Sequence, residues 1–577
     1  MSTSTPSSAP TNAPLPTTPA TVTVGQYLAT RLVQAGATHV FGLPGDYNLS
    51  LLDQILTVDG VEWVGSTNEL NAAYAADGFA RIHRGLGALV TTYGVGELSA
   101  INGIAGSFAE DVPVIQITGA PRTGSAQAGL KVHHTLIDGD FDHFSRAYRE
   151  VTIAQTTLRF HDAGQEIDRV LVAALEASKP GYISIPADVA ISQIPAGNLA
   201  TPLRARRSDP DTLLRFEADL RLALEGQTEL TVLAGPRLHR KNLEPAMRML
   251  ADVSGVRVAS QAGSRAIIDE SHPHSLGMYN GAMTKTPGTR ELVDGATPLI
   301  LAGVVMSDFL TGFFSHGFEP GRSIELDFTQ ARIRGVSYYD VSLADSLAVV
   351  EKIALELAMP AAPHTPVVAG VAAVETKDAT APLSQDGFWS EIQTWLPSDT
   401  IAIAEAGTAF YGALELSMPN GSDLMGQPVW SSIGFTLPAM LGAAIAAPTK
   451  RVVLFIGDGS AQLTIQELGT VLKRGLAPIV FLINNDGYTV ERAIQSPAAV
   501  YQDINSWNWT AVPATLAPHV ASETLTVRSV AELRGALALA SAVTDRLVFI
   551  EVVVPPLDQP ALLVELASGV AAANASA

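Results

Sequence analysis

The segment RVVLFIGDGSAQLTIQELGTVLKRGLAPIVFLINN, residues 451–485, decides the fold of the C-terminal part of the chain. Arg451–Ile456 and Pro478–Ile483 are short apolar runs of the kind found in strands buried on both faces. Between them, Ala461–Lys473 has an apolar stripe of helical spacing, and Gly475 provides a stop. Such a strand–helix–strand unit crosses over right-handedly, so both strands should be parallel and end at the same edge of a sheet.

Polar residues follow both predicted strands. Gly457-Asp458-Gly459 comes directly after the first strand and Asn484-Asn485 after the second. We therefore expect the Asp458 carboxylate and the Asn485 amide to lie side by side, as hard oxygen ligands that suit Mg²⁺ or Ca²⁺. Backbone N–H groups of Gly459 and Ser460 would bind phosphate. The simpler alternative is an ordinary turn in which Asp458 only caps the helix, and the spaced asparagine pair favours the metal site.

This pattern resembles the motif with which thiamine diphosphate (ThDP) enzymes bind their cofactor. The resemblance implies that Asp458, the side chain of Asn485 and the carbonyl of Gly487 hold Mg²⁺ against the diphosphate. The cofactor-binding residues that it implies along the chain are Pro44, Glu69, Thr92, Thr408, Ser431, Ile433, Asp458, Gly459, Ser460, Asn485, Gly487, Tyr488 and Thr489.

Length and composition predict a large globular protein. The 577 residues are enough for roughly three to four domains, and 47% of them are hydrophobic. The formal charge of −21 argues against nucleic acid or an anionic membrane as a partner. Because cysteine is absent, disulfides, thiolate metal ligands and cysteine nucleophiles are excluded. No apolar run is long enough to span a membrane, and residues 1–21 do not form a secretory signal. We expect a disordered tail at 1–21 and a cytoplasmic enzyme.

Strand-like and helix-like segments alternate along the chain, which predicts an α/β fold with a doubly wound parallel sheet in each of three domains. The expected domains are 22–194, 195–360 and 383–577, with an Ala-, Pro- and Thr-rich linker at 361–382. Leu233–Arg237 reads LAGPR instead of Gly-x-Gly-x-x-Gly, so a structural or regulatory role is expected there rather than dinucleotide binding. Further expected strands are His39–Phe41, Val61–Gly65, Ala88–Thr91, Val114–Ile117, Ile183–Ile185, Leu230–Ala234, Val256–Ala259, Leu299–Leu301 and Ile324–Leu326.

Glu69 lies in the run STNELNAA, which follows the expected strand Val61–Gly65 and opens an apolar helix. A glutamate in the first turn of a helix is most simply explained by its interaction with the helix dipole. Beside the metal motif, the resemblance implies another role. ThDP chemistry needs a carboxylate at N1′ of the aminopyrimidine, which favours the imino form that removes the proton from C2. Glu69 is the candidate.

The same chemistry requires the two rings of ThDP to fold over a bulky apolar side chain. The run Trp430-Ser431-Ser432-Ile433-Gly434 resembles the segment that supplies this side chain. It implies that Ile433 lies beneath the ring junction and that the carbonyl of Ser431 accepts the 4′-amino group. Many relatives carry glycine at the Ser431 position, but a backbone acceptor survives that change.

Three more segments narrow the resemblance: GLPGDYNL at residues 42–49, the pair His133-His134, and GYTVER at residues 487–492. Together with the metal motif and Glu69 they look like the ThDP-dependent 2-oxo acid decarboxylase family, which includes pyruvate, indolepyruvate, phenylpyruvate and branched-chain enzymes. The motifs occur in the family's order and span residues 22–570.

The family resemblance implies catalytic roles for five residues, Asp46, Glu69, His133, His134 and Glu491. The cofactor accepts the electron pair as CO₂ leaves, and the side chains move protons as an aldehyde is released. The simplest alternative for His133-His134 is a pair of solvated imidazoles in a surface loop. Because adjacent side chains diverge, we expect one histidine to touch the reacting atoms and the other to orient its partners.

Residues 484–509 look closer to the indolepyruvate, phenylpyruvate and branched-chain enzymes than to dedicated pyruvate enzymes. Val490 would enlarge the substrate pocket, Phe309 and Phe410 would narrow it, and Ala406 replaces a glutamine common in the indolepyruvate enzymes. One methylene changes discrimination by only about 1–3 kcal/mol, so we expect broad specificity and leave the preferred acid open. The implied pocket wall comprises Phe309, Ala406, Phe410, Tyr411, Val490, Ile494, Leu562 and Leu566.

Three other functions stay open: a pyruvate-preferring decarboxylase, a carboligase similar to acetohydroxyacid synthase, and a non-catalytic cofactor-binding protein. The carboligase would carry a flavin in the middle domain and usually lacks the histidine pair. The resemblance also implies that the pyrimidine binds the first domain of one chain and the diphosphate binds the third domain of another. The smallest competent unit would then be a homodimer, and a homotetramer is common.

Overall fold

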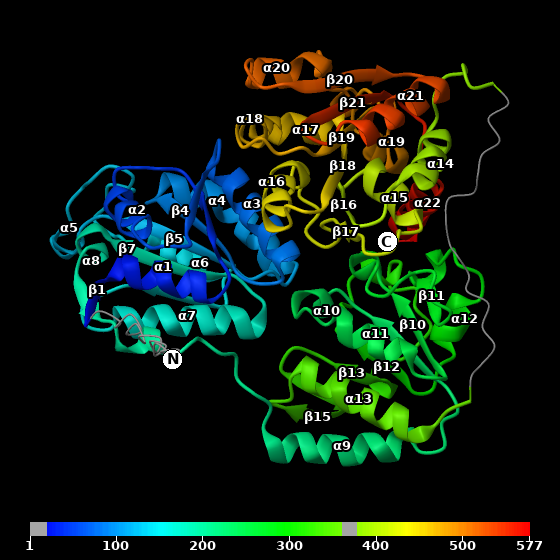
Figure 1. Ribbon diagram of the computed structural model, residues 1–577, viewed down its shortest axis with the longest axis horizontal. Helices are drawn as coiled ribbons and strands as arrows, with labels where there is room; N and C mark the ends of the chain where they lie inside the picture. Colours follow the sequence, from blue (N-terminus) through cyan, green and yellow to red (C-terminus); the bar gives the residue numbers. More distant parts are fainter. Residues whose placement is uncertain (1–19, 361–377, 577) are drawn as a thin grey trace, which may run out of the picture.

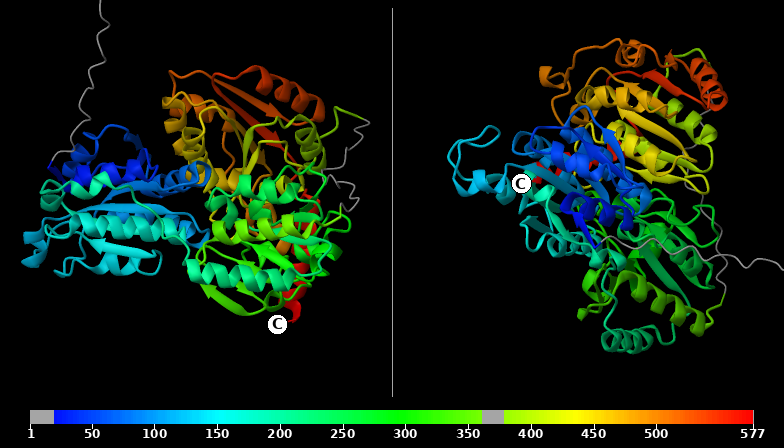
Figure 2. Two further views of the ribbon diagram at one scale, coloured as in Figure 1. Left: turned by 60° about the horizontal axis from the view of Figure 1, so that its bottom comes forward. Right: turned by 60° about the vertical axis from the view of Figure 1, so that its left-hand side comes forward.

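The computed structural model describes residues 20–360 and 378–576. Three large sheets flanked by helices follow one another along the chain (Figure 1). The N-terminal domain lies to one side of a column formed by the C-terminal and middle domains, and the views in Figures 1 and 2 agree on this arrangement. The expected α/β fold with three parallel-sheet domains is confirmed.

The sheet of the N-terminal domain is entirely parallel, with the order β3-β2-β4-β5-β7-β6. Strands β4, β5 and β7 are buried along their whole length, as expected for the centre of a parallel sheet. The strands are β2 (His39–Gly42), β3 (Glu62–Gly65), β4 (Gly87–Thr92), β5 (Val114–Ala120), β6 (Ala154–Thr157) and β7 (Gly181–Pro186). The helices are α1 (Val24–Gln34), α2 (Leu49–Ile55), α3 (Glu69–His83), α4 (Val95–Ala109), α5 (Thr123–Gln127), α6 (His143–Tyr148), α7 (Ala163–Ala177) and α8 (Ala187–Ala190).

The sheet of the C-terminal domain is also parallel, with the order β17-β16-β18-β19-β21-β20. Its strands are β16 (Thr400–Ala404), β17 (Asp423–Met425), β18 (Arg451–Gly457), β19 (Ile479–Asn484), β20 (Ser522–Val527) and β21 (Leu547–Val553). Its helices are α14 (Gln385–Trp395), α15 (Thr408–Glu415), α16 (Thr436–Ala446), α17 (Asp458–Thr464), α18 (Leu468–Lys473), α19 (Thr489–Ile494), α20 (Val512–Leu516), α21 (Val530–Ala542) and α22 (Ala561–Ser576).

The middle domain adds an antiparallel hairpin to a parallel sheet. Its order is β11-β10-β9-β12-β13-β14-β15, and the last two pairings are antiparallel. The strands are β9 (Leu230–Ala234), β10 (Val256–Ser260), β11 (Ser275–Met278), β12 (Leu299–Ala302), β13 (Ile324–Leu326), β14 (Gln330–Ile333) and β15 (Val336–Tyr339). The helices are α9 (Pro210–Leu224), α10 (Arg237–Arg240), α11 (Glu244–Asp252), α12 (Thr289–Asp294) and α13 (Leu343–Leu357).

The turn after β9 packs tightly against the neighbouring strand end. A Cβ atom on Gly235 would lie 2.1 Å from the carbonyl oxygen of Gly303. Arg237 forms ion pairs with Asp111 of the N-terminal domain and with Asp327, each at 2.9 Å. In this chain the LAGPR turn therefore joins two domains.

The predicted strands are all present, and their ends differ from the expected ones by at most three residues. The largest extension is in β5, where buried Thr118 continues the strand beyond Ile117. The helix expected at Ala461–Lys473 begins earlier, at Asp458, and a 3₁₀ turn at Ile465–Glu467 divides it into α17 and α18.

Helix α3 of the N-terminal domain packs directly on α16 of the C-terminal domain. Glycines allow this close approach, because a Cβ atom on Gly442 would lie 1.9 Å from the carbonyl oxygen of Ala75, and one on Gly78 would lie 2.2 Å from that of Ala439. Residues Asn71–Arg81 of α3 are all buried, so the helix is enclosed on every side. The contact fixes the two domains of one chain relative to each other.

The predicted tail at 1–21 lies outside the described residues except for its last two positions. Thr21 begins β1 (Thr21–Thr23), which pairs with β8 (Gln193–Pro195). In the linker expected at 361–382, residues 361–377 also lie outside the described part, and Pro382 forms a bridge with Ser529. Among the described helices, none is both long and apolar enough to cross a membrane.

Candidate active site

Asp458 and Asn485 lie side by side, as predicted, because β18 and β19 are adjacent parallel strands that end just before them. Oδ1 of Asp458 accepts the N–H of Gly459 at 2.8 Å, and Oδ2 accepts the N–H of Gly487 at 3.3 Å. Burial raises the pKa of the Asp458 carboxyl to about 6. Gly457 occupies the N-cap of α17, and Asp458 is the first residue of the helix.

The side-chain amide of Asn485 can take two orientations, which suit different surroundings. One terminal atom lies 3.1 Å from Oδ1 of Asp458 and 2.8 Å from the carbonyl oxygen of Gly487, and the other lies 3.0 Å from Oγ1 of Thr489. If nitrogen faces Asp458, the amide donates to both oxygens. If oxygen faces Asp458, three oxygens converge without a hydrogen between them, which requires a cation. This donor set fits Mg²⁺ or Ca²⁺.

A cavity of about 210 Å³ opens beside these oxygens. Phe309, at the start of a 3₁₀ turn in the middle domain, faces Phe410 and Tyr411 across ring-centroid distances of 5.6 and 5.8 Å. Burial and then the charge of Glu491 raise the pKa of Tyr411 to about 12. Predicted residues in the cavity wall are Phe309, Ala406, Thr408, Phe410, Tyr411, Ser431, Ile433, Asp458, Gly459, Ser460, Asn485, Gly487, Tyr488, Thr489, Val490 and Glu491.

Three predicted pocket residues lie outside the wall of this cavity. Leu562 and Leu566 are buried on α22, which packs against α15 and α19. Ile494 is the last residue of α19. In this single chain these side chains support the elements that carry the wall.

The turn that carries Ser431 and Ile433 is held by buried carboxylates that sequence analysis missed. Ser431 has φ of 52°, in the left-handed region that favours glycine. Oε1 of Glu110 accepts the N–H groups of Val429 and Trp430 at 2.7 and 3.1 Å. This bond ties the turn to the N-terminal domain.

Glu405 follows β16 and links it to the helix after the same turn. Its Oε2 accepts the hydroxyl of Thr436 at 2.6 Å and the N–H of that residue at 3.1 Å, and its Oε1 accepts the N–H of Ala406 at 3.1 Å. Burial raises the pKa of Glu405 to about 7. The sequence does contain a signal for Glu405, because it is a single charged residue directly after the apolar run TIAIA. A carboxylate buried at the end of a strand needs several hydrogen-bond donors, so such a residue is expected to hold neighbouring segments together.

Glu69 begins α3, as predicted, at the carboxyl edge of the N-terminal sheet. The preceding turn is held by Glu467 of the C-terminal domain, which sequence analysis also missed. Oε2 of Glu467 accepts the N–H and the hydroxyl of Thr67 at 3.0 and 2.7 Å and the side-chain amide of Asn71 at 3.1 Å. The position of Glu69 therefore depends on two domains.

Buried polar atoms near Glu69 lack partners. A Cβ atom on Gly96 would lie 3.2 Å from Oε1 of Glu69 and 3.1 Å from Cγ2 of Thr92, so these residues converge. Oγ1 of Thr92 and Oγ of Ser66 are buried and have no hydrogen-bond partner among the described residues. Buried polar groups are normally satisfied, so this edge fits a ligand with polar ring atoms.

Asp46, His133 and His134 form one cluster at the same edge. Nε2 of His133 lies 2.7 Å from Oδ2 of Asp46, and the two imidazole rings are 4.7 Å apart. Tyr47 stacks on His133 at 4.9 Å. Nδ1 of His134 is buried without a partner among the described residues. The histidines are therefore not two independent solvated imidazoles.

In this single chain the two groups of candidate residues do not share a cavity. The wall beside Asp458 contains none of Asp46, Glu69, His133 and His134. The side chains of His133 and Asp46 remain 60% and 50% exposed. Each sheet edge thus carries a different part of the predicted site.

Comparison with known proteins assigns all three domains. Residues 22–144 match the N-terminal TPP binding domain of thiamine pyrophosphate enzymes, residues 220–353 their central domain, and residues 407–552 their C-terminal TPP binding domain. Thiamine pyrophosphate (TPP) is another name for ThDP.

Full-length relatives narrow the assignment. An alpha-keto-acid decarboxylase of Mycobacterium avium is 42% identical over 547 residues, 94% of this chain and 96% of the relative. Proteins with the same name from Mycobacterium tuberculosis and Mycobacterium leprae are 42% and 41% identical, over 95% of this chain and 97% and 95% of their own lengths. The chain therefore belongs to the thiamine pyrophosphate enzymes and, within them, to the alpha-keto-acid decarboxylases, a group of carboxy-lyases.

Proposed function

We propose that this enzyme decarboxylates a broad range of 2-oxo acids without oxidation, with Mg²⁺ and ThDP as cofactors, and releases the aldehyde. The range would include phenylpyruvate, indolepyruvate, branched-chain 2-oxo acids and pyruvate. The observation that carries the proposal is the pairing of the Asp458–Asn485–Gly487 cluster, whose oxygens fit a cation, with a carboxylate–imidazole cluster at corresponding edges of two similar sheets.

In this proposal the residues of the C-terminal edge hold the charged end of the cofactor. Asp458, Asn485 and the Gly487 carbonyl would bind Mg²⁺, which in turn binds the diphosphate. Ser431 and Ile433 would support the rings. When bound, ThDP supplies the electron sink that accepts the electron pair left by CO₂.

The residues of the N-terminal edge would handle protons. Glu69 would hold a proton at N1′ of the aminopyrimidine, with Pro44 and Thr92 beside it. The 2.7 Å bond between Asp46 and His133 lets the carboxylate orient the imidazole. His134 keeps a buried nitrogen free for a partner. Glu491 would supply a further carboxylate from the opposite wall of the substrate space.

The cavity wall supports a substrate with an apolar side chain. Phe309, Phe410 and Tyr411 form an aromatic surface, Val490 also lines the cavity, and Ala406 presents no polar group. A pyruvate-preferring enzyme is the second candidate, because Phe309 and Phe410 narrow the space. Aromatic contact favours the broader range.

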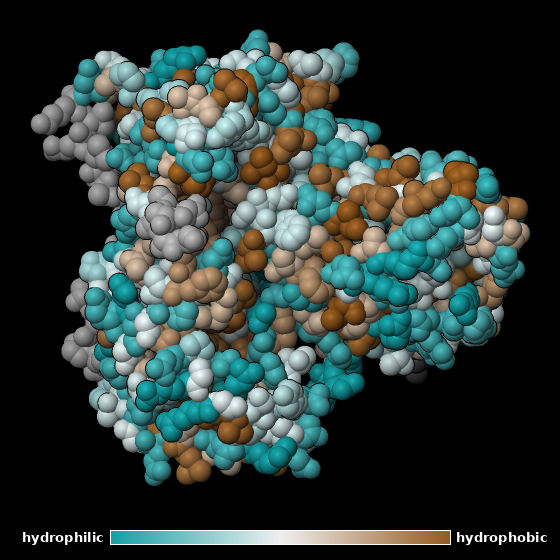
Figure 3. Space-filling model, turned by 180° about the vertical axis from the view of Figure 1, so that it is seen from behind, coloured by the Kyte–Doolittle hydropathy of each residue, from teal (hydrophilic) through white to brown (hydrophobic). Residues whose placement is uncertain are grey.

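A homodimer would complete the site by bringing the N-terminal edge of one chain to the C-terminal edge of another. Near the N-terminal edge, Leu49, Val95 and Leu136 are 50%, 58% and 60% exposed. At the C-terminal edge, Ile433 and Leu463 are 37% and 50% exposed. Figure 3 shows hydrophobic residues gathered on parts of both domains. Exposed apolar surface of this kind is typical of an interface between subunits.

The test is to measure CO₂ release from pyruvate, a branched-chain 2-oxo acid, phenylpyruvate and indolepyruvate, with and without ThDP and Mg²⁺. The proposal expects turnover of all four substrates only when both cofactors are present. Turnover of pyruvate alone would favour the second candidate. Light scattering on the same samples should show at least a dimer, and an active monomer would contradict the shared site.

A further inference from the structure

A second cavity lies at the opposite edge of the C-terminal sheet from the candidate active site. Its volume of about 540 Å³ falls within the range of about 300–1,000 Å³ that is common for small-molecule sites. It forms where α14 ends and where β18 and β19 begin, and it shares no lining residue with the cavity beside Asp458. The proposed function assigns no role to it.

Arg451, the first residue of β18, is a cation in this cavity with unused hydrogen-bonding capacity. Its Nη2 donates to the carbonyl of Val543 at 2.8 Å, and its Nη1 makes no hydrogen bond among the described residues. Its Nε is buried below the surface that a ligand could reach. Burial lowers the pKa of Arg451, and the charge of Asp545 offsets only part of that effect. Asp545 is itself bonded to Arg546 at 3.0 Å.

The other cation of the cavity wall is already engaged. Nζ of Lys450 donates to the carbonyl of Gly421 at 2.7 Å and to Asp423 at 2.9 Å. The Nη1 of Arg451, by contrast, has no acceptor in the described part of the chain, and a carboxylate in the cavity would accept a charge-assisted hydrogen bond from it. Among the described residues of the cavity wall, Arg451 is therefore the one free cation, which favours an anionic ligand.

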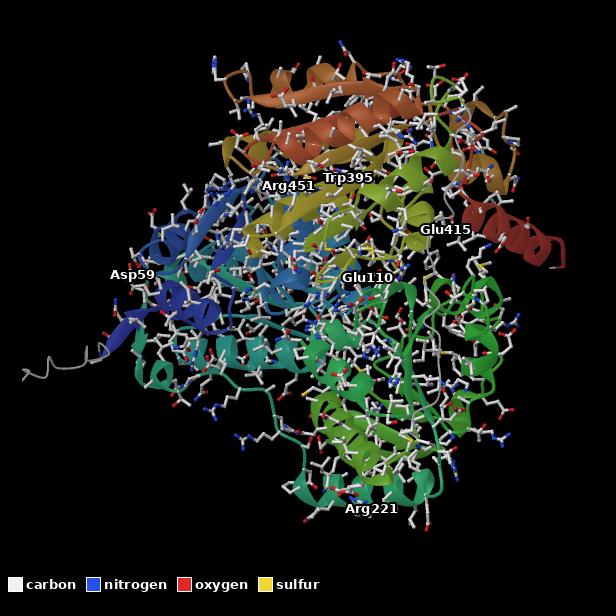
Figure 4. The ribbon with its side chains drawn as sticks, turned by 45° about the vertical axis from the view of Figure 1, so that its right-hand side comes forward. Asp59, Glu110, Arg221, Trp395, Glu415 and Arg451 are labelled. Atoms are coloured by element: carbon white, nitrogen blue, oxygen red, sulfur yellow. The ribbon has the colours of Figure 1, made fainter. Side chains whose placement is uncertain are left out.

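Trp395, at the end of α14, provides an aromatic wall next to this cation. Figure 4 labels Trp395 and Arg451, which lie on the C-terminal domain, and both line the cavity. Nε1 of Trp395 donates to Oγ of Ser541 at 2.9 Å, and its ring meets the edge of Phe481 at 5.6 Å. The indole is held in place from two sides, and Leu476 and Ile479 extend the apolar surface.

We propose that this cavity is a second ligand site that binds an organic carboxylate with an aromatic or branched apolar body. The carboxylate would accept from Arg451, and the body would pack on Trp395. An inorganic anion would leave the apolar wall uncovered, and a neutral apolar molecule would leave the charge of Arg451 without a counter-ion. β18 separates the site from Asp458 by seven residues, roughly 23 Å at the rise of a strand. Both sites can therefore be occupied together.

The probe for the test is 3-phenylpropionate, which has the required shape but no 2-oxo group to react. Binding to the full chain is measured by isothermal titration calorimetry, with and without ThDP and Mg²⁺. We expect saturable binding in both conditions. The substitution Arg451→Met should weaken it by about tenfold or more, because a charge-assisted hydrogen bond is lost. Arg546→Met, which removes a nearby exposed arginine outside the cavity, should leave the affinity unchanged. The neutral 3-phenylpropionamide should bind more weakly than the acid.

Equal affinity of the wild type and Arg451→Met, equal binding of the acid and the amide, or no saturable binding at millimolar concentration would each overturn the proposal. A second measurement covers the case in which Arg451→Met does not fold. An aryl diazirine carboxylate, photolysed with the wild-type chain, should label the peptides that contain Trp395 and residues 475–479. Labelling confined to residues 406–411 or 485–491 would place the ligand in the candidate active site and contradict a second site.

Discussion

The N-terminal and C-terminal sheets have the same topology but carry different chemistry. If the strands of each sheet are numbered along the chain, both orders read 2-1-3-4-6-5. The order reverses between β2 and β4 in one sheet and between β16 and β18 in the other, and ligands bind at such switch points in open α/β sheets. The candidate residues lie at the ends of these strands or just after them: Pro44–Asp46 and Thr92 in the N-terminal domain, Glu405–Thr408 and Asp458 in the C-terminal domain.

The difference lies in how the side chains at each edge are satisfied. At the C-terminal edge, the Asp458 carboxylate is buried and hydrogen-bonded by the backbone, which suits a bound cation and diphosphate. At the N-terminal edge, the Asp46–His133 pair is half exposed, and Thr92 and His134 keep unpaired buried atoms. The shared topology therefore determines where a ligand binds, and the residues after the strands determine which part of the ligand binds there.

The largest effect is expected from Asp458→Asn, which removes the negative charge of the C-terminal edge. Mg²⁺ affinity should fall by more than about 100-fold, since removing a residue that only hydrogen-bonds to a metal ligand already costs about 10- to 100-fold. CO₂ release at ordinary Mg²⁺ concentration should then be lost. Calorimetry with Mg²⁺ in the presence of ThDP measures the affinity, and Asp486→Asn, at an exposed neighbour, is the matched control. Unchanged Mg²⁺ binding in Asp458→Asn would show that the cation does not bind at the C-terminal edge.

The same residue makes the C-terminal edge pH-dependent. Its folded pKa of about 6 lies above the ordinary value of 3.8, so its contribution to the stability of the metal-free protein is full below 3.8 and is lost as pH rises through 6. Mg²⁺ binding requires the carboxylate and should strengthen over this range. Chemical denaturation and calorimetry between pH 5 and 8 check both trends, and neither should persist in Asp458→Asn.

A smaller effect is expected from Glu69→Gln at the N-terminal edge. The amide cannot hold the proton at N1′, so kcat should fall by about 10²- to 10⁴-fold, the usual contribution of a general acid or base. Mg²⁺ affinity should stay at the wild-type value, which separates the two edges experimentally. Glu62→Gln, at the start of β3, is the control. Loss of Mg²⁺ binding in Glu69→Gln would mean that proton transfer and cation binding are not separated between the two edges.

Sequence analysis placed Asp458 and Asn485 together because both strands are continuous apolar runs and parallel crossovers have one hand. It also recognised Glu69 and the histidine pair, whose short motifs are local. Local patterns of this kind carry enough information to locate the edges of a parallel sheet. The three-residue strand β17 and the hairpin of β14 and β15 lacked such a pattern.

The residues that position the site could not be predicted in the same way. Glu110 binds the backbone of Val429 across 319 positions, and Glu467 binds Thr67 across 400. Such contacts depend on how two domains pack, and nothing in the local sequence pairs one carboxylate with a distant turn. The aromatic contact of Phe309 with Phe410, between the middle and C-terminal domains, was expected only through the family resemblance.

The fourth prediction concerns the Asp46–His133 pair. We expect His133→Gln to lower kcat by about 100-fold, because an imidazole that can pass a proton to or from the reacting atoms is removed. Steady-state kinetics of CO₂ release measure the change. His143 provides a matched control, since it makes the same 2.7 Å contact with an aspartate, Asp138, outside the candidate site. An equal loss in His143→Gln would indicate a general structural effect of removing an exposed histidine–aspartate pair.

The smallest effect is expected at the aromatic wall of the cavity beside Asp458. Phe410→Leu should raise the ratio of kcat/KM for phenylpyruvate to kcat/KM for pyruvate by about tenfold. A smaller residue in the wall admits a larger substrate side chain, and a pocket change of this size is worth about 1–3 kcal/mol. Phe314→Leu, at a ring 62% exposed, is the control. The ratio could stay at the wild-type value in both Phe410→Leu and Phe314→Leu while Glu69→Gln and Asp458→Asn behave as expected. The two edges would then hold the cofactor, but the wall would not select the substrate. Specificity would then come from residues that the second subunit contributes.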